Sequence, residues 1–139
     1  MLYGIGCDLC EVARMEKSLS GAQGPAFVRR VFGPAEQAAL GLGAEAEPWP
    51  ARRASAHKAA SAAADFAAKE AFLKAAGTGL AAPFSLCEIE AVRLPGGAPA
   101  YHFSGRSAQW VEARRLRAHL SLSHEDGMAM AYCILETET

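Results

Sequence analysis

Hydrophobic residues follow two different spacings along the chain, and the change between them predicts the fold class. Near the start, residues 2–7 alternate glycines with larger apolar side chains, which is typical of a short strand that Asp8 closes. Apolar positions then recur at helical spacing, which predicts a helix over 11–19. Two short helices are expected over 25–32 and 34–42, because each starts with a proline and is followed by a glycine. A loop is expected over 43–50 and a further helix over 51–76. The last helix is rich in alanine and free of proline, so we expect it to be the longest.

The second half of the chain changes to a period of two. Alternating polar and apolar residues predict strands at 85–94, 100–103, 119–123 and 128–135. A helix is expected over 106–116, between the second and third of these strands. Turn residues, Pro95-Gly-Gly97 and His124-Glu-Asp-Gly127, predict an antiparallel hairpin in each pair. We therefore expect an α+β fold, with an antiparallel sheet packed on the long helix, in a single domain over 1–139.

Composition narrows the possible environments and partners. The chain has 139 residues, 51% of them hydrophobic, and a formal net charge of −1, so we expect no general nucleic-acid binding. No stretch reaches the roughly 18 apolar residues of a membrane span, and Met1 to Asp8 contains no basic segment before an apolar core. We expect a cytoplasmic protein without a membrane partner.

The sequence has four cysteines, and two of them form the motif Cys7-Asp-Leu-Cys10. This spacing is found in half of a zinc site and in thioredoxin-like redox pairs. A zinc site needs a second pair, whereas Cys87 and Cys133 stand alone in apolar runs. The pattern favours small buried side chains, with a redox module as the alternative.

A first candidate for chemistry is Gly4-Ile-Gly6-Cys-Asp8. A dinucleotide-binding fingerprint requires a third glycine at position 9, where this chain has leucine, so that interpretation fails. A carboxylate at the end of a glycine-bearing strand suits a hard cation such as Mg²⁺, because the glycines let a ligand or another backbone approach closely. The alternative is an aspartate that caps a turn.

The long helix carries a second candidate. Glu70 and Lys74 share one face with the small residues Ala63 and Ala67, which leaves room for a ligand beside two opposite charges. Such a pair suits a metal and the phosphate that it holds, but it is also an ordinary solvent-exposed helix pair.

The third candidate is His124, which follows a strand that ends Ser121-Leu-Ser123. A histidine there can donate to phosphate or accept a proton near neutral pH. Alternatively, the neighbouring backbone satisfies its ring nitrogens.

Together these segments resemble the holo-acyl-carrier-protein synthase family of 4′-phosphopantetheinyl transferases. The similar motifs, in chain order, are Gly4-Ile-Gly6-Cys-Asp8, Phe66-Ala-Ala-Lys69-Glu70-Ala-Phe-Leu-Lys74-Ala, Gly77-Thr-Gly79, Gly97-Ala-Pro99 and Ser121-Leu-Ser-His124. They span nearly the entire chain. The resemblance implies transfer of the phosphopantetheine arm of coenzyme A to a serine of an apo acyl carrier protein, with release of adenosine 3′,5′-bisphosphate.

The resemblance also implies residue roles. Asp8 and Glu70 would be the Mg²⁺ ligands, and Glu70, Lys74 and His124 would take part in catalysis. The proton acceptor stays open between His124 and Glu70 acting through a metal-bound water. The residues implied to bind coenzyme A and its metal are Asp8, Lys69, Lys74, Gly77, Ser123 and His124.

Partners follow from the resemblance as well. In this family a basic first helix meets an acidic carrier protein, and here Arg14 and Lys17 stand on that helix. The resemblance further implies a homotrimer with active sites between subunits, in which Asp8, Glu70 and Lys74 form one wall.

One position departs from the family pattern. Asp65 stands directly before Phe66, where the family usually has an arginine that helps to hold a coenzyme A phosphate. Basic residues nearby are candidates for the missing charge: Arg52, Arg53, His57 and Lys58. The alternative is a catalytically impaired homologue that only binds carrier protein or coenzyme A.

Overall fold

The computed structural model describes residues 1–42 and 52–138, and for 52–55 it describes the backbone. The expected loop over 43–50 lies outside these residues. In chain order the elements are β1 (Leu2–Glu11), α1 (Val12–Ser20), α2 (Gly24–Val31), α3 (Pro34–Leu40), α4 (Arg52–Ala76), the 3₁₀ turn η1 (Leu86–Glu88), β2 (Ile89–Arg93), β3 (Pro99–Phe103), α5 (Gly105–Ala113), β4 (Leu116–Glu125) and β5 (Met128–Thr137). The expected α+β class is confirmed.

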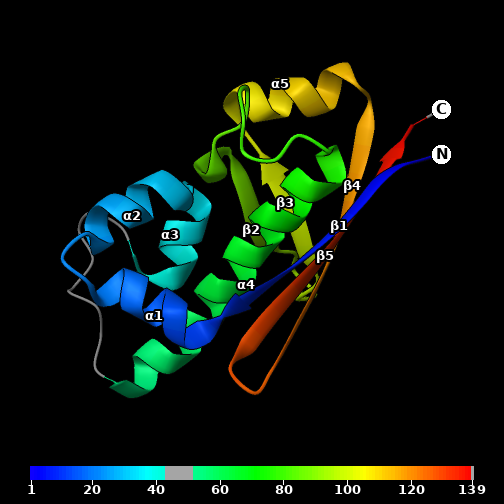
Figure 1. Cartoon of the computed structure of the whole chain (residues 1–139). Coiled ribbons are helices and arrows are strands. Elements are labelled where there is room, and N and C mark those ends of the chain that lie inside the picture. Colours follow the sequence, from blue (N-terminus) through cyan, green and yellow to red (C-terminus); the bar gives the residue numbers. More distant parts are fainter. Residues whose placement is uncertain (43–51, 139) are drawn as a thin grey trace.

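The long helix α4 packs along one face of a three-stranded antiparallel sheet with strand order β1-β5-β4 (Figure 1). Its contact with β1 depends on two glycines. A Cβ atom at Gly4 would lie 2.0 Å from the carbonyl oxygen of Ala75, and one at Gly6 would lie 2.1 Å from that of Ala71. The glycines that mark the first motif therefore admit a helix backbone.

A smaller sheet, β2-β3, covers another side of α4, with α5 above it (Figure 1). Phe72 of α4 joins these parts in an aromatic cluster. Its ring centroid lies 5.4 Å from that of Phe84, 4.9 Å from Phe103 and 6.3 Å from Trp110. Offset and edge-to-face contacts of this kind add to the stability gained from burial. Helices α1, α2 and α3 gather on the remaining side of α4.

Several expected boundaries were wrong, and the strands account for most of the differences. Asp8 lies inside β1 rather than at its end, because pairing with β5 continues to Glu11. Likewise, His124 lies inside β4, paired with Ala129, and the turn is confined to Asp126 and Gly127. The last helix ends at Ala113 because β4 begins at Leu116. Pairing with β5 therefore extended both β1 and β4 beyond the ends that the local sequence predicts.

The cysteines do not form a redox or zinc pair. Cys7 is exposed and Cys10 is buried, since residues three apart on a strand point to opposite faces. Their Cα atoms are about 10 Å apart at strand spacing, beyond the reach of a disulfide. Burial raises the pKa of the Cys10 thiol, the opposite of what a reactive thiol needs. Cys133 is buried as expected, whereas Cys87 is partly exposed.

In the part of the chain that the structure describes, no helix combines the length and the apolar character needed to cross a membrane.

Candidate active site

Asp8, Glu70 and Lys74 meet where β1 passes α4. The Lys74 ammonium donates to the carbonyl oxygen of Cys7 at 2.9 Å and to Oδ1 of Asp8 at 3.0 Å. These contacts use two of its three N–H donors, and 55% of the Lys74 side chain is exposed. The close approach at Gly6 brings the strand and the helix near enough for the two charges to pair.

The electrostatics show that Glu70 belongs to the same group. Partial burial raises the pKa of the Glu70 carboxyl, the negative charge of Asp8 raises it further, and Lys74 opposes the shift. Conversely, the hydrogen bond and charge of Asp8 raise the pKa of Lys74. Two carboxylates therefore repel each other across a site that holds one ammonium, an arrangement that a bound cation would stabilise.

The side chains at this site suit Mg²⁺, which needs few protein ligands, better than a metal whose ligands all come from protein side chains. Among residues 1–42 and the described side chains of 56–138, no cluster of three or more histidine, cysteine or carboxylate side chains is placed to hold a metal. Mg²⁺ is commonly held by one or two carboxylates, while waters and substrate phosphates complete its coordination. Asp8 and Glu70 match that number of ligands, and the exposed ammonium of Lys74 has the charge that suits a phosphate.

Lys69 does not join this group. Its side chain is fully buried, where its ammonium pairs with Glu36 and donates to the carbonyl oxygens of Leu86 at 3.1 Å and Ile89 at 2.7 Å. These three acceptors occupy all three N–H donors of a lysine. The expected contact between Lys69 and coenzyme A is therefore at odds with the structure, in which Lys69 ties α4 to α3 and β2.

Glu36 completes this buried network. Its carboxylate also accepts from the backbone nitrogen of Gly33 at 3.1 Å and of Ala91 at 3.0 Å. The backbone nitrogen of Glu36 in turn donates to Glu90 at 2.9 Å. The sequence carried a weak signal for this role, since glutamate at the third position of a helix after Gly33-Pro34 is a capping pattern.

The structure places His124 apart from Asp8. His124 is on the edge strand β4 and Asp8 on the opposite edge strand β1, so β5 and about 10 Å of sheet separate the two strands. His124 and Asp8 both point to the face that α4 covers, but they lie near opposite flanks of that helix. Within one chain, His124 does not join Asp8, Glu70 and Lys74.

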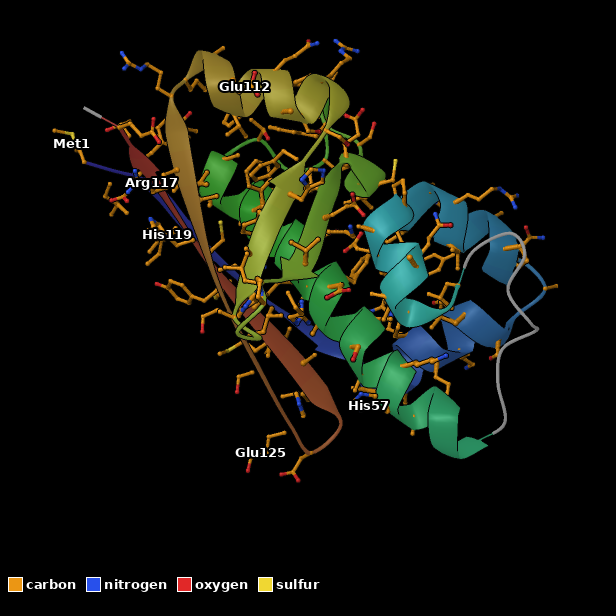
Figure 2. All side chains as sticks on the ribbon, turned by 180° about the vertical axis from the view of Figure 1, so that it is seen from behind. Met1, His57, Glu112, Arg117, His119 and Glu125 are labelled. Carbon is orange, nitrogen blue, oxygen red and sulfur yellow. The ribbon has the colours of Figure 1, made fainter. Side chains whose placement is uncertain are left out.

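Instead, His124 lines a pocket of about 370 Å³ on the β4 side of α4. The pocket lies between the first half of α4, the end of β4 and the β2-β3 turn, and its lining residues include His57, Arg93, Gly97 and His124. Figure 2 shows His57 on the first turns of α4 and Glu125, the residue after His124, at the hairpin end of β4.

Two other residues expected to bind coenzyme A are exposed. Gly77 directly follows α4 with a φ of 83°, in the left-handed region that favours glycine. Ser123 points to the outer face of the sheet, opposite Met130. Neither residue lines the pocket that holds His124.

That outer face carries a band of exposed apolar side chains. The register places Ile5 opposite Ile134, and Leu9 opposite Met130, with Tyr132 between them. Exposed fractions range from 37% for Ile134 to 62% for Leu9. His119 and Arg117 project from β4 on the same side, away from the helices (Figure 2). A contiguous apolar face of this kind marks an interaction surface.

Arg14 and Lys17 are both exposed on α1, one turn apart. Two further exposed arginines, Arg29 and Arg30, lie in the last turn of α2. Basic side chains therefore lie exposed on the neighbouring helices α1 and α2.

Comparisons with known proteins identify the family of this chain. The family model described as the 4′-phosphopantetheinyl transferase superfamily matches residues 4–133. A holo-acyl-carrier-protein synthase of Delftia acidovorans is 38% identical over 138 residues, which cover 98% of each chain. The chain belongs to the phosphopantetheinyl transferase superfamily and, within it, to the holo-acyl-carrier-protein synthase family. It is therefore a transferase enzyme.

Solved structures support the fold assignment. A holo-acyl-carrier-protein synthase from Neisseria meningitidis superposes with a TM-score of 0.78 at 28% identity, covering 99% of this chain and 100% of that one. The corresponding Bacillus anthracis enzyme, solved in complex with CoA (3′,5′-ADP), has a TM-score of 0.73 at 29% identity, with 99% of each chain covered.

Proposed function

We propose that the protein transfers the 4′-phosphopantetheine group of coenzyme A to a serine of an apo acyl carrier protein and releases adenosine 3′,5′-bisphosphate. The observation that carries this proposal is the grouping of Asp8, Glu70 and Lys74 between β1 and α4. Family membership supplies the reaction class, and the coenzyme A complex of the Bacillus anthracis relative supports the donor.

We propose Mg²⁺ as the metal, held by Asp8 and Glu70. When bound, it would neutralise charge that develops on the phosphate oxygens. Lys74 supplies a second positive charge and, through its bond to Asp8, keeps that carboxylate in place.

In the transfer, the serine oxygen forms a bond to the phosphorus that carries pantetheine. The bond from that phosphorus to the bridging oxygen breaks, and the nucleotide leaves with the bonding electron pair. The serine proton passes to a base. Glu70 and His124 are the two candidates for this base.

We further propose that two copies of the chain complete one site, within a homotrimer. His124 lies too far across the sheet to serve Asp8 and Glu70 of its own chain, so a neighbouring copy would supply it. The apolar outer face of the sheet provides a surface for such an assembly. The exposed Arg14 and Lys17 of α1 would dock the acidic carrier protein. A cytoplasmic location stays a prediction.

Intact-mass spectrometry tests the proposed reaction. An apo carrier protein incubated with this protein, coenzyme A and Mg²⁺ should gain one phosphopantetheine group, and chelation of the metal should abolish the gain. Glu70→Gln should slow the transfer by about 100-fold or more without unfolding the protein. Binding of coenzyme A without transfer to any of several carrier proteins would instead support an impaired homologue.

A further inference from the structure

The position that departs from the family pattern has a partner on β2. Asp65 is buried, with 6% of its side chain exposed, and its Oδ1 accepts from a terminal guanidinium nitrogen of Arg93 at 3.3 Å. The Arg93 side chain is 41% exposed. The buried carboxylate of Asp65 thus binds one nitrogen of the Arg93 guanidinium, and the rest of the Arg93 side chain is partly exposed to solvent.

The exposed part of Arg93 opens into the pocket that contains His124. The lining residues with ionisable side chains are His57, Arg93 and His124, and none of the described lining residues is acidic. A guanidinium and two imidazoles around a pocket of about 370 Å³ suit a phosphate monoester, a doubly charged group that takes several hydrogen bonds.

We infer that Arg93, positioned by the buried Asp65, binds the 3′-phosphate of coenzyme A in this pocket. The inference rests on the proposed function, since coenzyme A is the donor there. In this arrangement, Asp65 does not itself contact the phosphate but orients Arg93, which supplies the charge missing at position 65. Lys58, another candidate for the missing charge, extends toward Gly41.

Calorimetry with two ligands tests the role of Arg93. Dephospho-coenzyme A lacks the 3′-phosphate and matches coenzyme A elsewhere. The wild-type protein should bind coenzyme A at least about tenfold more tightly than dephospho-coenzyme A, as expected for a charge-assisted contact. Arg93→Ala should lose most of that preference, Arg93→Lys should keep part of it, and the control Arg106→Ala, an exposed arginine of α5, should keep all of it.

Kinetics test the positioning role of Asp65. Asp65→Ala should raise the KM for coenzyme A several-fold with little change in kcat, and should leave the KM for dephospho-coenzyme A unaltered. A purely structural role would change both ligands alike.

If wild-type protein binds coenzyme A but Arg93→Ala retains the full preference over dephospho-coenzyme A, this inference is overturned while the proposed function stands. If wild-type protein binds neither ligand, both fail.

Discussion

Lys69 illustrates how one residue can match a motif and still serve the fold. The ammonium is fully enclosed and has three acceptors, so it has no donor left for a substrate. A sequence motif reports that lysine is required at a position, but it does not report which way the side chain points. Only the packing of α3 and β2 against α4 shows that Lys69 faces inward.

Lys69→Met should therefore lower stability without weakening coenzyme A binding. The substitution leaves Glu36 buried without its cation, which typically costs about 3–5 kcal/mol. Urea unfolding measures the loss, and Lys69→Met combined with Glu36→Gln should recover part of it, because the unpaired charge is gone. A variant of normal stability whose KM for coenzyme A is raised would instead make Lys69 a substrate contact.

Among the elements, the contact between β1 and α4 positions the site. Gly6→Ala would place a Cβ atom 2.1 Å from the Ala71 carbonyl oxygen and 2.7 Å from the Ala75 backbone nitrogen. Backbone atoms cannot move aside cheaply, so the strand and helix must separate, at a cost of about 1–3 kcal/mol. Because Asp8 and Lys74 lie on these two elements, transfer activity should fall together with the melting temperature.

Gly96→Ala is the matched control for this prediction. Gly96 has open space around its Cβ direction, so stability should change by less than about 0.5 kcal/mol. Equal melting temperatures for the Gly6→Ala variant and wild-type protein would show that the two elements can separate without cost.

Local sequence patterns predicted which helices and strands form better than they predicted the residues at which these elements begin and end. The alanine-rich, proline-free run is a strong helix signal, and α4 follows it closely from Arg52 to Ala76. Strand ends depended on partners far away in the sequence: β1 continues past Asp8 because β5, the last strand, pairs with it. The Asp65–Arg93 contact likewise joins residues 28 positions apart, so no local pattern predicts it.

For the whole molecule, the two halves of the proposed site lie on opposite flanks of α4. Asp8, Glu70 and Lys74 are on the β1 side, whereas Arg93 and His124 are on the β4 side. Within one chain, α4 lies between these two groups. In the proposed assembly, the β1-side group of one chain would meet the β4-side group of a neighbouring copy.

Mixing two inactive variants is the most direct test of the proposal that two chains share each active site. Glu70→Gln and His124→Ala are each expected to be inactive, yet each chain retains the group that the other lacks. After the subunits exchange at equal ratio, about a quarter of the interfaces should contain both groups. The mixture should then load the carrier protein at about a quarter of the wild-type rate, as followed by intact mass. A mixture no more active than its two components would contradict the proposal that two chains share each site.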